Sequence, residues 1–152
     1  MKILKMSLVS LAFILVLTAC GSGNKKLTCT QKASEDGFAM STTITVEFNK
    51  EKPAKVKMVV KTSAESKEMK DAWGTMADLL KEGLGAETSK PGISVNGKND
   101  AKAYSYTITY DIDIAKASKE DLEEMDMDDV AGSNETYDSI KKSATSDGFT
   151  CK

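Results

Sequence analysis

The chain contains neither arginine nor histidine, and all 21 of its basic residues are lysine. Without arginine, no guanidinium group can hold a phosphate or carboxylate in a bidentate clamp. Without histidine, the usual general base near neutral pH is missing, and so is the commonest metal ligand. Most familiar catalytic sites cannot be built from this sequence. We therefore expect that the protein is not an enzyme and uses no cofactor.

The sequence also lacks a basic excess and a phosphate-binding loop. Its 23 acidic residues outnumber its lysines and give a formal net charge of −2, which argues against a nucleic-acid partner. The segment Gly83-Leu84-Gly85 lacks the later glycine of a dinucleotide-binding loop and follows an expected helix instead of a strand. Nucleotide binding is therefore not predicted.

The longest apolar run lies near the start of the chain, after two lysines, and ends in Leu17-Thr18-Ala19-Cys20. This layout is typical of a secretory signal peptide, and its last four residues resemble the lipobox of a bacterial lipoprotein. We interpret residues 1–19 as a lipoprotein signal peptide that is removed before Cys20. A transmembrane helix is the alternative, but it needs about 20 predominantly apolar residues. Three polar residues interrupt this run: Ser7, Ser10 and Thr18.

A lipid on Cys20 would place the protein on the extracytoplasmic face of a bacterial cell membrane, with a Gram-positive cell favoured. Two acyl chains, such as palmitate, are the usual requirement for stable attachment. Residues 20–26 would form a short flexible tether that reaches about 20 Å, since an extended chain spans ~3.5 Å per residue. Ordinary secretion with a free Cys20 thiol is the alternative.

The number of cysteines supports lipidation, because three cysteines in an exported protein leave one thiol unpaired. If Cys20 carries lipid, Cys29 and Cys151 remain. We predict a disulfide between them that joins the two ends of the fold in an oxidising compartment. A reactive thiol pair and metal ligation are the alternatives, although the CxxC spacing of redox sites is absent.

The pattern of strands and helices expected in residues 27–152 indicates a single α+β domain. Apolar and polar residues alternate over 27–31, 38–48, 56–60 and 104–114, as in strands that bury one face. A short strand is expected at 93–95, and Asn96-Gly97 is expected to turn the chain into the strand that follows. The last residues, Phe149 to Cys151, are expected to lie along the first strand.

Three helices are expected between and after these strands. The first begins at a capping box formed by Thr62 and Glu65, and ends at Gly83 or Gly85. The second begins at Ser118, and the third begins at Ser133 or Asn134 and ends at Gly148. The order βββ-α-ββ-α-α predicts an antiparallel sheet with helices packed on one face.

Carboxylates on the polar face of strand 104–114 are the first candidate site. Asp111 and Asp113, with Glu47 as a candidate neighbour, could serve hydrolysis or bind a metal ion. Carboxylates opposite lysines on a solvated sheet face are more often plain surface charge. An enzyme that uses Asp111 or Asp113 is therefore the least favoured function.

The acidic segment 120–129 is the second candidate, with Asp126, Asp128 and Asp129 as weak candidates for metal ligands. An EF-hand loop that started at Asp126 would have Val130 where an oxygen ligand is required. The segment is more typical of a solvated acidic helix face than of a specific cation site.

Methionines and aromatic residues form the remaining candidates. Met125 and Met127 are soft ligands that suit Cu(I), but gap-filling in the core explains methionines better. Periodicity gives core positions to Met40, Met58, Met69 and Met76. An aromatic ligand groove is another interpretation, although its members all lie on expected core faces: Trp73, Tyr104, Tyr106 and Tyr110.

The chain resembles the small YehR-like lipoproteins. The resemblance lies in the lipobox at Cys20, the strand Tyr-Thr-Ile-Thr-Tyr-Asp-Ile-Asp-Ile at 106–114, the acidic helix after it and Gly148-Phe149 at the closing helix. It implies a compact α+β domain. It implies no catalytic or binding residue, because the molecular function of that family is not established. The Cys29 and Cys151 pair resembles a feature of its Gram-positive-looking members.

Two classes of function follow. The favoured one is a membrane-anchored, non-catalytic binding module of the cell envelope, which recognises a protein, peptide or wall component through the sheet face or the acidic helix. The alternative is a carrier lipoprotein for a small ligand or metal cation that uses segment 120–129.

Overall fold

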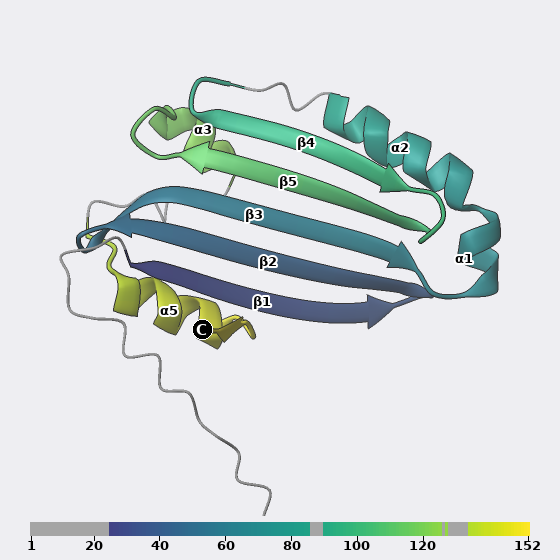
Figure 1. The fold of residues 1–152 in the computed structure, drawn as a ribbon, viewed down its shortest axis with the longest axis horizontal. Helices are drawn as coiled ribbons and strands as arrows, with labels where there is room; N and C mark the ends of the chain where they lie inside the picture. The colour runs from purple at the N-terminus through teal and green to yellow at the C-terminus, as the bar shows by residue number, and fades with distance from the viewer. Residues whose placement is uncertain (1–24, 86–89, 126, 128–133) are drawn as a thin grey trace, which may run out of the picture.

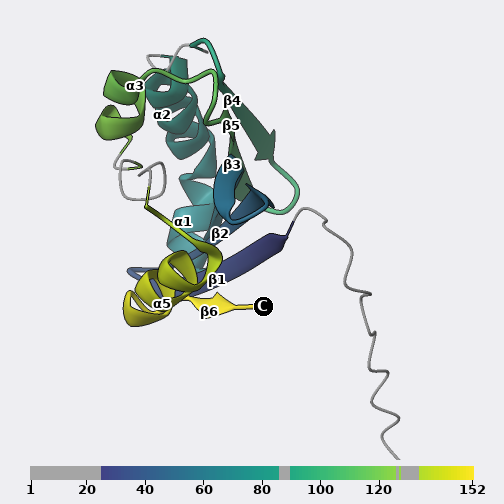
Figure 2. The ribbon, with the colours of Figure 1, turned by 90° about the vertical axis from the view of Figure 1, so that its left-hand side faces the viewer.

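The computed structural model describes residues 25–85, 90–125, 127 and 134–152. Its strands form one six-stranded antiparallel sheet in the order β4-β5-β3-β2-β1-β6. Figure 1 shows the strands from β4 to β1, and Figure 2 shows β6 beside β1. The described helices all lie on one side of this sheet (Figure 2). The predicted fold class, α+β with an antiparallel sheet and helices on one face, is confirmed. The elements are β1 (Lys26–Glu35), β2 (Phe38–Asn49), β3 (Lys52–Ala64), α1 (Lys67–Asp71), α2 (Trp73–Gly85), β4 (Ile93–Asp100), β5 (Ser105–Asp113), α3 (Lys119–Glu124), α5 (Tyr137–Ser146) and β6 (Thr150–Cys151).

A row of buried aliphatic residues crosses five neighbouring strands. Its members stand opposite one another across the sheet: Leu27, Val46, Val56, Ile112 and Ile93. Because side chains alternate between the two faces of a strand, the period-two pattern turns this row toward the helices. Full burial of one such side chain contributes about 1.5 to 3 kcal/mol. The row is therefore a principal source of the stability of the sheet.

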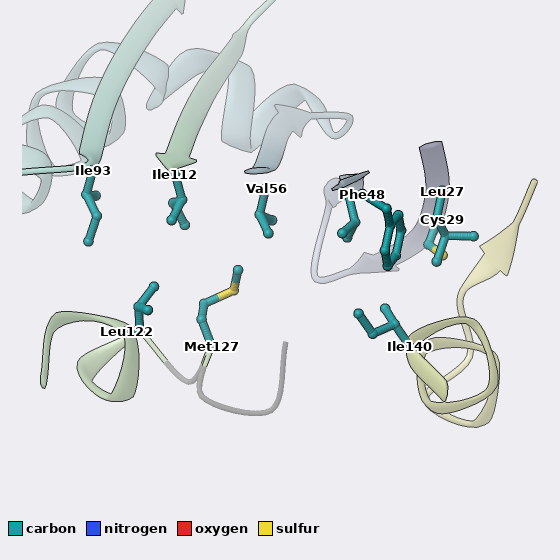
Figure 3. Close-up of a cluster of buried hydrophobic side chains, with 10 residues drawn as sticks. Leu27, Cys29, Phe48, Val56, Ile93, Ile112, Leu122, Met127 and Ile140 are labelled. Carbon is teal, nitrogen blue, oxygen red and sulfur yellow. The ribbon is translucent and has the colours of Figure 1, made fainter. Parts of the chain in front are cut away.

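Helices cover this inner face at two places. Near one end of the strands, three side chains point toward the apolar row: Leu122 of α3, Ile140 of α5, and Met127 from the chain between these helices (Figure 3). Near the other end, Trp73 of α2 packs in a second cluster with Tyr106 of β5. The core therefore consists of two clusters on the same face of one sheet.

The first helix starts later than the capping box predicted. Thr62 and Ala64 still belong to β3, where they pair with Met40 and Phe38. The true N-cap is Ser66, whose hydroxyl accepts a hydrogen bond from the amide of Met69 at 3.2 Å. Strand pairing therefore outweighs the local capping signal, and the helix is divided at Ala72 into α1 and α2.

The predicted turn at Asn96-Gly97 is wrong. Both residues lie inside β4, opposite Thr109 and Ile108 of β5. The chain turns after Asp100, whose carboxylate accepts hydrogen bonds from the amides of Lys102 and Ala103. This Asp-centred turn lets the two strands pair as far as Asp100 and Ser105, which stabilises a longer hairpin than the Asn-Gly turn would allow.

The closing helix begins later than predicted and ends where predicted. Its N-cap is Thr136, which forms a capping box with Ser139, instead of Asn134; Ser133 lies outside the described residues. After α5, Gly148 adopts a positive φ of 87° that favours glycine, as predicted for the end of the helix.

The last strand joins the first, as predicted. Cys151 stands opposite Cys29 in the β1–β6 pair, and a disulfide links them. Backbone hydrogen bonds between Thr28 and Lys152 extend the pairing. β6 pairs with Cys29 and Thr30 only, so no strand of the described chain covers the outer edge of β1 beyond Thr30.

No helix in the described part of the chain is long and apolar enough to cross a membrane. Every described strand and helix lies between Lys26 and Cys151, and these elements supply both core clusters. Residues 25–152 therefore contain both described core clusters and are expected to fold by themselves.

Loss of the disulfide should destabilise residues 25–152 without changing the fold. The paired Cys29→Ala/Cys151→Ala variant should lower the free energy of unfolding by about 2 to 5 kcal/mol, because the disulfide closes a long loop in the unfolded chain. Urea denaturation followed by circular dichroism measures the change. The unreduced wild-type protein should show no reactive thiol, and labelling of both cysteines in the folded state would contradict the assignment.

Candidate functional site

An apolar groove of about 830 Å³ lies between α2 and the inner face of the sheet. Its floor comes from β1, β2, β3 and β5, and one wall is α2. Met40 on the floor is 48% exposed and Leu79 on the wall is 59% exposed. Large apolar side chains left open beside a concave surface are typical of a binding site.

Strand register builds the floor of the groove. Met40 of β2 stands opposite Ala33 of β1 on one side and opposite Thr62 of β3 on the other. Side-chain alternation places all three on the same inner face. On the wall, Met76, Leu79 and Leu80 have the three- and four-residue spacing that brings side chains to one side of a helix.

The groove stays open because of where α2 and α5 are attached. Trp73 anchors α2 by packing with Tyr106 of β5, and its indole nitrogen donates a hydrogen bond to the Asn99 side chain at 3.1 Å. α5 instead packs against β1 and β6, at the other edge of the sheet. Since these attachments lie toward opposite edges of the sheet, the floor around Met40 keeps access to solvent.

A tight turn fixes the end of the groove near α1. Gly37, between β1 and β2, has a φ of 81°, and its carbonyl accepts hydrogen bonds from the amides of Glu65 and Ser66. A Cβ atom at Gly37 would lie 2.6 Å from the Ser66 hydroxyl oxygen. This close approach holds Glu35 and Asp36 at the groove, which they both line.

A second, smaller groove of about 390 Å³ runs between α5, the start of β1 and the C-terminal half of β2. Cys29, Ile140 and Phe149 line its apolar part. Its charged residues are Glu135 and Asp147. The Gln31 side chain donates a hydrogen bond of 2.9 Å to the carbonyl of Asp147, which ties α5 to β1 beside this groove.

The opposite face of the sheet carries the first predicted candidate site. Glu47, Asp111 and Asp113 do line one cleft, of about 630 Å³, as the sequence suggested. Lys57 lies 3.3 Å from Asp111, and Lys116 lies 3.1 Å from Asp113. Glu47 stands between Lys26 and Lys55 in the strand register. The cleft is thus a lattice of alternating charges, which the sequence predicted as the simpler interpretation.

In the described part of the acidic segment, three of the four carboxylates contact a lysine. Lys90 contacts Asp121 at 2.5 Å and Glu124 at 2.7 Å, and Lys119 contacts Glu123 at 2.9 Å. Asp126, Asp128 and Asp129 lie outside the described residues. Among the residues that the structure describes, no group of three or more acidic or cysteine side chains could hold a metal ion.

Some of the predicted positions of methionine and aromatic residues are confirmed by the structure, and others are wrong. Met127 is buried in the core, as gap-filling predicts, whereas the core position predicted for Met40 is wrong because no described helix covers it fully. Trp73 and Tyr110 line the main groove. Tyr104 lies in the β4–β5 turn and is 39% exposed, so its predicted place on a core face is wrong.

Comparison with solved structures shows the same fold in two bacterial proteins. The NMR structure of a protein from Streptococcus pneumoniae TIGR4 is 17% identical, has a TM-score of 0.57 and covers 100% of this chain and 98% of its own. The NMR structure of the Escherichia coli YehR protein is 18% identical, has a TM-score of 0.51 and covers 85% and 92%. No protein-family model and no curated protein sequence matches the chain. The YehR-like resemblance therefore holds for the fold.

The contact between Lys90 and α3 should make stability depend on pH. Hydrogen bonds from Lys90 and then from the Ser118 hydroxyl hold the pKa of Asp121 below its ordinary value. The stabilisation is therefore complete above the unfolded pKa, about 3.9, and disappears as the pH falls through the lowered folded pKa. Asp121→Asn should reduce the urea midpoint at pH 6 and match the wild type near pH 2.

Glu120→Gln on the same helix is the matched control for this measurement. Glu120 is exposed, and no ion pair to it is found among the described residues. Its variant should follow the wild-type pH dependence. An Asp121→Asn curve that stays parallel to the wild type from pH 2 to 6 would exclude the ion pair as the cause.

Proposed function

We propose that this protein is a non-catalytic binding module of the bacterial cell envelope, held at the outer face of the cell membrane by a lipid on Cys20. Its binding surface is the groove between α2 and the sheet. The observation that carries the proposal is the exposure of Met40 and Leu79 on facing sides of that groove.

The energetics of the groove favour a bound partner. Burial of a Leu or Met side chain contributes about 1.5 to 3 kcal/mol when it is complete, and roughly half of each side chain is still exposed. A partner that covered Met40 and Leu79 would therefore gain about 1 kcal/mol from each, before its other contacts in the groove are added.

The distribution of polar groups supports binding over chemistry. The carboxylates best placed for catalysis, Asp111 and Asp113, each contact a lysine on the opposite face of the sheet. Neither of them lines the apolar groove. The groove itself offers apolar side chains with two carboxylates, Glu35 and Asp36, at one end. Such a surface recognises a partner by shape, apolar contact and charge.

The position of β1 agrees with attachment through Cys20. β1 begins at Lys26, six residues after that cysteine, and the intervening chain extends to about 20 Å. The domain would thus stay near the bilayer while the groove stays accessible. The cation-carrier alternative depends on Asp126, Asp128 and Asp129, and the described structure adds no observation that favours it.

Replacing exposed apolar side chains of the groove by polar ones should weaken its binding of apolar molecules. The neutral fluorophore N-phenyl-1-naphthylamine should bind residues 25–152 with increased fluorescence, and Met40→Gln/Leu79→Gln should weaken binding by about 10-fold through loss of apolar burial. Val59→Gln is the control, because Val59 lies on the opposite face of β3. Equal binding by all variants would reject the groove as the binding surface.

Lipid attachment is tested in the full chain expressed in a bacterium. Cys20→Ala should abolish incorporation of labelled palmitate, because no thiol remains at the lipobox. Ser22→Ala, two residues away in the tether, should retain it. Incorporation that persists in Cys20→Ala would show that the lipid is not attached there.

A further inference from the structure

We infer that the groove binds an extended peptide that pairs with the free edge of β1 and places alternate apolar and basic side chains into the groove. This inference rests on the proposed function and specifies its partner. Three separate observations carry it: an edge of β1 that no described strand pairs with beyond Thr30, exposed apolar residues on the adjacent floor, and carboxylates at the end of the groove beside that edge.

The free edge begins where β6 stops. β6 pairs with β1 at Cys29 and Thr30 only, although β1 continues to Glu35. The amide of Thr28 donates to the carbonyl of Lys152, so Thr28 directs its backbone groups toward the β6 side. Because this direction alternates along an antiparallel strand, Lys32 and Ser34 also direct their N–H and C=O groups to that edge. A peptide can extend the sheet by pairing there.

The groove lies directly beside this edge. Ala33 and Glu35 line it from β1, and Met40 lines it from the neighbouring strand β2. Residues that stand opposite each other in paired strands share a face. A peptide residue opposite Ala33 would therefore reach the apolar floor near Met40, and the residue two positions away, opposite Glu35, would point to the same side.

The charge of the groove favours a basic side chain at the peptide position opposite Glu35. The charged residues that line the groove are Glu35 and Asp36, and neither has an ion-pair partner among the described residues. The nearest lysine on β1, Lys32, belongs to the opposite face by strand alternation. A lysine or arginine opposite Glu35 would thus meet uncompensated negative charge.

The charge of the smaller groove also favours a basic partner. Its charged lining residues are Glu135 and Asp147, whereas the cleft on the other face of the sheet is lined by five lysines and three carboxylates. Both grooves on the helix-covered face therefore favour a cationic partner. The recognised segment has an apolar residue and a basic residue two positions apart, with small or polar residues between them.

The inference is tested with a labelled peptide of sequence Thr-Val-Thr-Leu-Ser-Lys-Thr and residues 25–152, with its disulfide formed. Valine, leucine and lysine occupy alternate positions and so face the groove together. Fluorescence anisotropy should show saturable binding. Glutamate in place of lysine should weaken binding by at least about 10-fold, since it replaces attraction by repulsion. A peptide of the same composition with valine, leucine and lysine consecutive should also bind at least 10-fold more weakly.

Two protein variants separate edge pairing from charge. Ser34→Pro removes an N–H at the free edge, where proline is tolerated in a sheet, and should weaken peptide binding by about 10-fold while binding of N-phenyl-1-naphthylamine is unchanged. Glu35→Gln/Asp36→Asn should weaken binding of the lysine peptide by about 3- to 10-fold at low salt and remove the preference over the glutamate peptide. Glu120→Gln/Asp138→Asn changes two exposed carboxylates away from the groove, on α3 and α5, and is the matched control that should bind like the wild type.

Hydrogen exchange gives a readout that does not depend on variants. Peptide binding should slow exchange of the Lys32 and Ser34 amides, while those of the opposite sheet edge in β4 should not change. Peptide binding without this protection would overturn the strand-pairing inference. Binding of the naphthylamine without peptide binding would also overturn it and leave the proposed function standing. Concentration-dependent dimers that protect the same amides would show that a second copy of the chain occupies the edge.

Discussion

The structure depends on confinement of apolar side chains to one face of a long antiparallel sheet. Five residues, from Leu27 on β1 to Ile93 on β4, form a continuous buried row across that face. A shift of one residue in any strand would turn its part of the row to solvent, so the register of the whole sheet is strongly specified. The helices then have only one apolar surface on which to pack.

The groove follows from how few helices share that surface. α2 is anchored by Trp73, and α5 is joined to β1 through the short strand β6. Their attachments lie toward opposite edges of the sheet, and the inner face between them keeps Met40 accessible. The opposite face needs no helices to cover it, because lysines and carboxylates alternate across it. One face of the sheet thus provides both the buried core and the proposed binding surface.

Most of the architecture could be predicted from the sequence, because the strand periodicity in 38–48 and 104–114 reflects the burial that holds the sheet together. The errors arose where local signals competed with strand pairing. Asn96-Gly97 resembles a hairpin turn, but pairing of β4 with β5 continues past it to the Asp100 turn. Thr62 resembles an N-cap, but it is held in β3 by Met40 on the neighbouring strand.

The candidate groove was less predictable than the fold. Periodicity assigns Met40 to the inner face correctly, but it cannot tell whether a helix covers that part of the face. The free edge of β1 also depends on the length of β6, which is only two residues. The cysteine pair can be predicted from the sequence, because the expected lipidation of Cys20 would leave two of the three thiols to pair with each other.

The link between β1 and β6 also determines how the protein carries mechanical load. Tension applied between the chain before Lys26 and the chain after Cys151 passes through only the first residues of β1 and the disulfide at Cys29. The intervening strands and helices form a covalently closed loop beside that path and are not stretched. Reduction would transfer the same tension to the short pairing of β6 with β1, and then to the pairing of β1 with β2 from its Lys26 end. The part of β1 that lines the groove, at Ala33 and Glu35, would be reached last.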